Sequence, residues 1–161
     1  MALVRRRALV LAALALSALV FAGCTINGGG SIYSAVGAKK ATFGFTWQTD
    51  DSLTQSATQN AGQLAKGFWS DGYVKFRIAS GGITFFGSSF PDCWSGTGEY
   101  VSQNRNYAGG GDLDIELCDR GEPGPTAGDF VDVDPTSGPY SWYENSGTIQ
   151  NGNLKLNSQG N

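Results

Sequence analysis

The sequence contains no histidine, only three cysteines and few charged residues, and each of these absences narrows the range of functions. Its 161 residues include no His, and 16% are charged. Without histidine the chain has no Ser-His or Cys-His nucleophile and no His-ligated zinc site. Lys and Arg number 11 against 14 Asp and Glu, which argues against nucleic acid as a partner. No pair of carboxylates is marked as a catalytic acid and base, so we expect no enzymatic activity.

The first 23 residues have the layout of a bacterial export signal. Arg5, Arg6 and Arg7 precede an apolar run over 8–22, which is too short for a comfortable membrane span. We therefore expect residues 1–23 to be a cleaved signal peptide. After cleavage eight basic residues face fourteen acidic ones, and this net charge of −6 gives the chain no attraction to an anionic membrane surface.

The end of this signal resembles the lipobox of bacterial lipoproteins. Ala22 and Gly23 are small residues before Cys24, although Phe21 stands where that motif usually has Leu. The resemblance implies that Cys24 carries diacylglycerol and palmitate and anchors the chain outside the cell, on the outer face of its membrane. The alternative is an ordinary signal peptide that ends near a chance cysteine.

The other two cysteines are expected to form a disulfide. Export leads to an oxidising compartment, and if Cys24 is acylated, Cys93 and Cys118 remain to pair. Such a disulfide closes a loop of 26 residues and contributes roughly 3.5 kcal/mol in the chain-entropy model. Two cysteines without histidine make a poor metal site.

Short alternating runs separated by Gly, Pro and Asn dominate the mature chain. Gly28-Gly29-Gly30 indicates a flexible tether, so Cys24 and the tether occupy 24–31 and one domain occupies 32–161. The strands expected from alternation are 41–48, 72–79, 83–86, 94–101, 112–118, 129–134, 148–150 and 153–156. No segment has a sustained helical period. The pattern predicts an all-β domain, an antiparallel β-sandwich of about eight short strands, with a barrel as the alternative.

The turns and the alternation make this prediction specific. Hairpin turns are expected at Gly81-Gly82 and Asn151-Gly152, a type II turn at Glu122-Pro123-Gly124, and irregular structure over 49–61. The residues expected to point inward are Ala41, Phe43, Phe45, Trp47, Val74, Phe76, Ile78, Leu113, Ile115 and Leu117. Those expected to point outward are Tyr73, Lys75, Arg77, Asp112, Asp114 and Glu116.

Several short stretches resemble a known extracellular family. They are Gly28-Gly29-Gly30-Ser31-Ile32, Lys40-Ala41-Thr42-Phe43-Gly44-Phe45, Asp119-Arg120-Gly121-Glu122-Pro123-Gly124, Gly128-Asp129-Phe130 and Ser146-Gly147-Thr148-Ile149. Together they resemble the post-choice-of-anchor domain, a Gly-rich module common in actinobacteria. The resemblance implies a secreted β-domain of surface-anchored proteins and no particular activity. Leu154-Lys155-Leu156 stands where that family often ends in Ile-Gln-Ile-His.

Two sets of residues are candidates for ligand binding. Tyr140, Trp142 and Tyr143 lie in a short Ser- and Gly-flanked segment, where exposed rings can stack on sugars. The alternative is that these rings fill core volume that the glycines leave empty. Asp119, Glu122 and Asp129 flank one turn of an acidic segment and are candidate calcium ligands, with a solvated acidic surface as the alternative.

These observations leave two hypotheses for function. The first is a non-enzymatic, lipid-anchored surface protein that acts as a structural or interaction module of the bacterial envelope, with another surface protein as its partner. The second is a carbohydrate-binding or cell-wall-binding module on the same anchor. An enzyme that uses the acidic residues is a third and weaker hypothesis.

Overall fold

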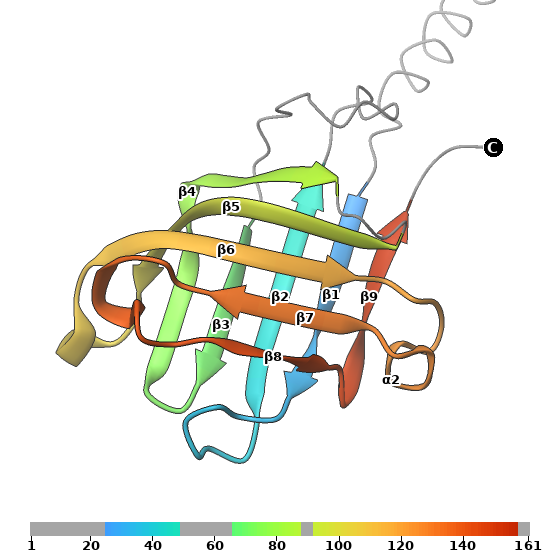
Figure 1. Ribbon diagram of the computed structural model, residues 1–161, viewed down its shortest axis with the longest axis horizontal. Helices are drawn as coiled ribbons and strands as arrows, with labels where there is room; N and C mark the ends of the chain where they lie inside the picture. The colour runs from blue at the N-terminus through green and yellow to red at the C-terminus, as the bar shows by residue number, and fades with distance from the viewer. Residues whose placement is uncertain (1–24, 49–65, 88–91, 158–161) are drawn as a thin grey trace, which may run out of the picture.

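The computed structural model describes residues 25–48, 66–87 and 92–157, and its strands form one antiparallel sheet (Figure 1). The strands are β1 (Thr25–Ile32), β2 (Ala41–Gln48), β3 (Lys66–Asp71), β4 (Val74–Gly87), β5 (Cys93–Ser102), β6 (Gly110–Cys118), β7 (Phe130–Asp134), β8 (Asn145–Thr148) and β9 (Asn151–Asn157). Their order in the sheet is β8-β7-β6-β5-β4-β3-β2-β1-β9. The expectation of an all-β antiparallel domain is confirmed.

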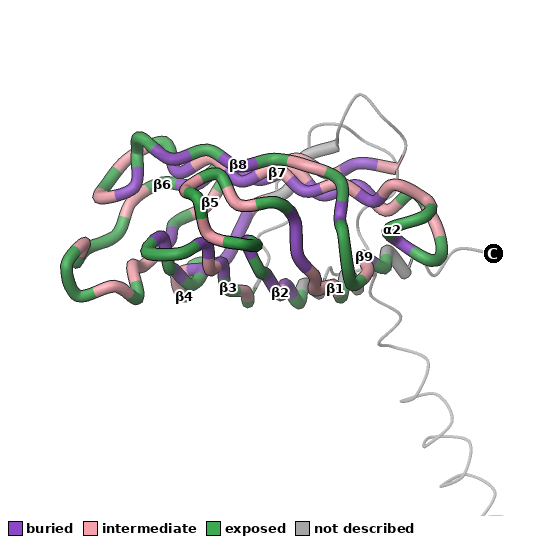
Figure 2. The backbone as a smooth tube through the Cα atoms, turned by 90° about the horizontal axis from the view of Figure 1, so that it is seen from below, coloured by how far each residue is buried: buried purple, intermediate pink, exposed green. Residues whose placement is uncertain are grey.

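The sheet curls until one half lies over the other. β4 bends from one half into the other, so that the half containing its end and β5 to β8 crosses the half containing β1 to β3, its start and β9 (Figure 1). Buried residues line the space between the halves (Figure 2). The two ends of the sheet meet beyond β8, where the Gln150 amide donates to the Ser31 carbonyl of β1 at 2.8 Å. The described residues therefore form one curled sheet, a half-barrel, rather than the two separate sheets that a sandwich requires.

Alternation places the core where the sequence predicts it. Ala41, Phe43 and Phe45 are at most 5% exposed, and the side chain of Trp47 lies outside the described part. On β6, Leu113, Ile115 and Leu117 are buried between outward acidic residues. The predicted disulfide joins Cys93 to Cys118 across β5 and β6, which are paired at these residues.

The segment expected to be a flexible tether is strand β1. It pairs with β2 on one side and with β9 on the other. Its glycines meet crowded neighbours: a Cβ on Gly28 would lie 2.4 Å from Leu154 Cδ2, and one on Gly30 would lie 2.3 Å from the Asn151 carbonyl oxygen. These glycines therefore allow the strand to pack closely against its neighbours. A glycine-rich stretch is typical of such a strand and also of a flexible linker, so composition alone does not distinguish them.

The Gly81-Gly82 hairpin prediction is wrong. Residues on both sides of it belong to β4, and its register against β5 shifts between Ile78 and Ile83. Gly82 has φ 73°, so it supplies the backbone of an irregularity within one strand rather than of a turn. The partner of β4 in a hairpin is β3, which the sequence analysis did not predict. The irregular segment expected over 49–61 lies outside the described residues.

Two predicted turns near the C-terminus are also wrong. The Asn151-Gly152 hairpin does not form, because β8 and β9 lie at opposite ends of the sheet and β9 pairs with β1. The type II turn fails because Gly124 lacks the positive φ that its position requires, and it begins the short helix α2 (Gly124–Ala127). Among the described residues, no helix has the length and apolar character needed to cross a membrane.

Candidate binding surface

Three aromatic side chains gather at one end of the sheet. Tyr73 lies in the turn between β3 and β4, Tyr107 ends the 3-10 helix η1 (Arg105–Tyr107), and Trp142 follows the 3-10 helix η2 (Gly138–Tyr140). The Tyr73 ring centroid lies 5.7 Å from that of Tyr107 and 5.9 Å from that of Trp142, with interplanar angles of 24° and 30°. Tyr73 is 45% exposed and Trp142 54%. We call Tyr73, Tyr107 and Trp142 the aromatic surface.

A buried tyrosine supports these rings from below. Tyr140 is fully buried, and its centroid lies 5.6 Å from that of Tyr107 and 6.4 Å from that of Trp142. Its hydroxyl lies 3.0 Å from Ser102 Oγ, and the Trp142 indole N–H donates to the Pro139 carbonyl at 3.1 Å. The aromatic surface is therefore held in place before any ligand arrives, which lowers the entropy cost of binding.

Of the three aromatic residues that the sequence analysis selected, the structure exposes one. Tyr140 and Tyr143 are at most 2% exposed, whereas Trp142 between them points outward. A turn after η2, in which the Tyr143 amide donates to the Tyr140 carbonyl at 2.8 Å, turns both tyrosines toward the core. Tyr73 joins Trp142 instead, and alternation along 72–79 does predict its outward position.

Tyr143 belongs to a buried polar network around Asp71. The Tyr143 hydroxyl donates to Asp71 Oδ2 at 2.9 Å and accepts from Trp69 Nε1 at 2.7 Å. The other donors to the Asp71 carboxylate are Ser34 Oγ, the Ala35 amide and Asn145 Nδ2. Burial raises the pKa of the Tyr143 phenol well above its ordinary value. Asp71 is fully buried and fully hydrogen-bonded, so this network holds the fold together and is not accessible to a ligand.

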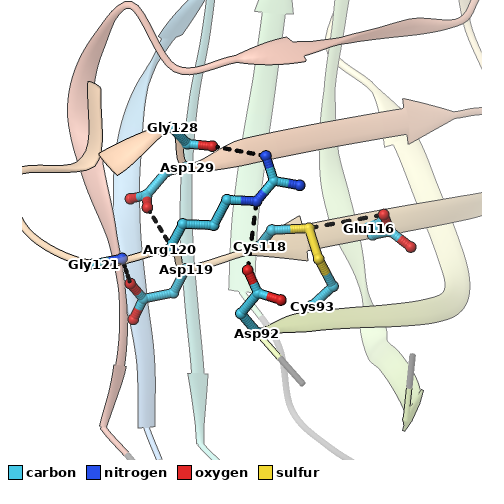
Figure 3. A network of polar contacts seen from close by, with 9 residues as sticks. All are labelled: Asp92, Cys93, Glu116, Cys118, Asp119, Arg120, Gly121, Gly128 and Asp129. Carbon is cyan, nitrogen blue, oxygen red and sulfur yellow. Dashed lines mark hydrogen bonds and ion pairs between the residues drawn. A yellow bond between two sulfur atoms is a disulfide. The ribbon is translucent and has the colours of Figure 1, made fainter. Parts of the chain in front are cut away.

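The candidate calcium ligands contact donors of the protein itself (Figure 3). The buried Asp129 accepts from the Arg120 amide at 2.8 Å and the Leu154 amide at 2.9 Å, and Asp119 Oδ1 accepts from the Gly121 amide at 3.0 Å. Both oxygens of Glu122 lie 2.7 Å from Asn153 Nδ2. In the described ranges these three carboxylates do not form a group with ligand atoms within 4.8 Å of one another. Their contacts join the turn before α2 to β9, and calcium binding stays a prediction.

One cluster of metal-ligand types does occur in the described residues, at the disulfide (Figure 3). Glu116 Oε1 lies 3.8 Å from Cys118 Sγ, and Cys93 completes the group. Both sulfur atoms are committed to the disulfide, with an S–S distance of 2.04 Å, so they carry no thiolate charge for a metal. Beside it the Arg120 guanidinium pairs with Asp92 at 3.4 Å and donates to the Gly128 carbonyl at 3.2 Å. This corner of the sheet is structural.

Comparison with known proteins adds no family to this description. No protein-family model, no curated protein and no solved structure matches the chain. The predicted lipid attachment site, Cys24, lies outside the described residues.

Proposed function

We propose that this chain is a non-enzymatic, lipid-anchored module of the bacterial envelope that binds carbohydrate of the cell wall through its aromatic surface. The observation that carries the proposal is the exposure of Tyr73 and Trp142 as neighbouring rings on a rigid support. The C–H faces of a sugar ring carry partial positive charge and stack favourably on the negative faces of aromatic rings. Exposed large aromatic residues gathered in one place are also typical of binding surfaces.

The start of β1 and the aromatic surface lie at opposite ends of the sheet, which suits a module anchored at its N-terminus. Thr25 is opposite Gln48, and Thr46 is opposite Lys66, so these residues share one end of the sheet. Tyr73 lies at the other end, because it follows Asp71, the last residue of β3. The eight residues of β1 separate the two ends by about 23 Å. A lipid on Cys24, one residue before β1, therefore leaves the aromatic surface at the end away from the membrane.

Two variants and a matched control test the binding. We use the mature chain with Cys24→Ser, which lacks the lipid and keeps every strand, and measure co-sedimentation with isolated cell-wall polysaccharide. Trp142→Ala and Tyr73→Ala should each weaken binding about tenfold, equivalent to 1.4 kcal/mol. Tyr33→Ala is the control, because Tyr33 is 72% exposed and forms no part of the aromatic surface.

The results separate the hypotheses. Carbohydrate recognition is supported if the unmodified chain and the Tyr33→Ala control bind and both Trp142→Ala and Tyr73→Ala bind more weakly. The absence of binding, or equal binding by all variants, contradicts it and favours a protein partner or a structural role. Parallel samples with calcium and with chelator test the predicted calcium site.

The anchor is tested separately in cells. Cys24→Ser in the full chain should release the protein from the membrane fraction, because no acyl chain then holds it there. Retention of this variant in membranes would contradict the lipid assignment without bearing on carbohydrate binding.

A further inference from the structure

The outward side of β3 and the first part of β4 carries three cations around an exposed ring. Phe68 is 51% exposed and lies opposite Arg77, and Lys66 and Lys75 are exposed on the same side. A Cβ on Gly44 would lie 2.8 Å from Phe68 Cε1, so the ring lies against β2 at Gly44 while about half of the residue stays exposed. We call Lys66, Phe68, Lys75 and Arg77 the basic face.

Next to the basic face lies one outward carboxylate, the exposed Glu99 of β5, two residues from Val101, which is opposite Arg77. Among the described residues it forms no ion pair with Arg77. The outward residues of β2 and β3 and of 74–78 include no Asp or Glu, because Asp71 points inward and is buried. An exposed phenylalanine among unpaired cations is an unpartnered sheet surface that combines apolar contact with positive charge.

The outward side of β6 and β7 has the opposite character. Asp114 lies directly opposite Asp134, and Glu116 directly opposite Asp132. Like charges at such positions destabilise a sheet, and Asp132 Oδ1 is buried with no hydrogen-bond partner. We call these four residues the acidic face; none of the described outward residues of β6 and β7 is basic.

The two faces lie on opposite sides of the molecule. The half-sheet with β6 and β7 and the half-sheet with β2 to β4 enclose the core, so their outward surfaces point away from each other (Figure 2). Both have the spacing of a β-sheet, about 4.8 Å between strands and about 6.7 Å between residues two apart on one strand. Lys75 and Arg77, two residues apart on β4, therefore have the same spacing as Asp132 and Asp134 on β7.

We propose that the basic face of one copy docks on the acidic face of a second copy, with Phe68 at the centre of the contact. An anionic polymer or membrane would satisfy only the basic face. A second copy satisfies both, since it brings three cations to a face that holds four carboxylates and no basic residue. Because the two surfaces differ and lie on opposite sides, the association is head-to-tail and extends into rows rather than closing as a symmetric dimer. This inference does not depend on the aromatic surface.

Charge reversal on each face gives a direct test. The mature chain with Cys24→Ser is studied by sedimentation velocity over a range of concentrations at low salt. The basic-face variant is Lys75→Glu with Arg77→Glu, and the acidic-face variant is Asp132→Lys with Asp134→Lys. The matched control is Lys39→Glu with Lys40→Glu, two exposed lysines outside the basic face.

The unmodified chain and the control should grow beyond dimers with concentration and dissociate at high salt, because screening weakens exposed charge pairs. Each face variant alone should stay monomeric. A mixture of the two variants should associate again, because the native acidic face of one variant meets the native basic face of the other and the two reversed faces are also of opposite charge.

Three results would overturn the proposal. The first is an unmodified chain that stays monomeric at low salt, and the second is a face variant that associates like the control. The third is a mixture of the two face variants that does not associate although each variant alone is folded and melts cooperatively. If the unmodified chain stays monomeric but binds anionic vesicles or a soluble polyanion through Arg77, the basic face serves that partner instead. The association of the unmodified chain at low and high salt is measured without any variant. It therefore tests the proposal even if one variant misfolds.

Discussion

Replacing Tyr143 with phenylalanine removes one hydroxyl from between two buried groups. Trp69 Nε1 loses the acceptor at 2.7 Å, and Asp71 loses the donor at 2.9 Å. A buried donor left without a partner costs about 1–3 kcal/mol, and a hydrogen bond to a charged group contributes about 1.5–3 kcal/mol. The phenylalanine ring keeps the contact with Trp69, whose centroid is 6.4 Å away. We expect Tyr143→Phe to lower the free energy of unfolding at pH 7 by about 3 kcal/mol.

The same substitution changes the response to alkali. Burial raises the pKa of Tyr143 in the folded chain above its ordinary value, which is about 10 when the chain is unfolded. The stability from this group is therefore fully present below pH 10. Above it the unfolded chain releases the proton and the folded chain does not, so stability falls by about 1.4 kcal/mol per pH unit. Tyr143→Phe removes this contribution, and its deficit should shrink above pH 10.

Urea unfolding monitored by circular dichroism between pH 7 and pH 11.5 measures both effects. Tyr33→Phe is the control, because Tyr33 is exposed and should change stability by less than about 0.5 kcal/mol. A loss below about 1 kcal/mol at pH 7, or equal alkaline slopes for the variant and the unmodified chain, would refute the reasoning.

Two further predictions concern the outward side of β5 to β7. Burial, with the charges of Glu144, Asp134 and Glu116, raises the pKa of Asp132, so its ionised form destabilises the fold above that pKa. Asp132→Asn should raise the free energy of unfolding at pH 7 by about 0.5–1 kcal/mol in urea titrations, a value discounted because Asp132 is partly exposed. The gain should disappear at pH 3. A loss of stability at pH 7 would contradict the assignment. Paired Cys93→Ser and Cys118→Ser substitutions should lower the free energy of unfolding by roughly 3.5 kcal/mol, and free thiols in the non-reduced mature chain would show by mass spectrometry that the disulfide is absent.

Strand positions and inward faces followed from the sequence wherever large apolar residues alternate with polar ones. This held for β2 and for β6, because burial of one side of a sheet imposes a two-residue period. The cysteine pairing also followed from their number. Strand β3 escaped prediction, because its inward residues include Gly67 and Asp71 rather than a run of apolar side chains.

The remaining errors come from contacts between distant segments. Whether Gly28 and Gly30 belong to a linker or a strand depends on β9, which is more than 100 residues away in the chain. Asn151-Gly152 is no hairpin turn because β9 pairs with β1, at the opposite end of the sheet from β8. The aromatic surface likewise joins Tyr73, Tyr107 and Trp142 from three separate segments, so no local pattern marks them as one site.

The most direct test of carbohydrate recognition follows the indole N–H signals of the tryptophans by NMR. Soluble cell-wall oligosaccharides are added to the mature chain with Cys24→Ser, and Trp142→Phe identifies the Trp142 signal. Trp142 is 54% exposed and Trp69 only 1%, so a ligand in solution reaches the Trp142 ring and not the Trp69 ring. Our account predicts a saturable shift of the Trp142 signal with little change at Trp69. An unchanged Trp142 signal at saturating oligosaccharide would contradict it.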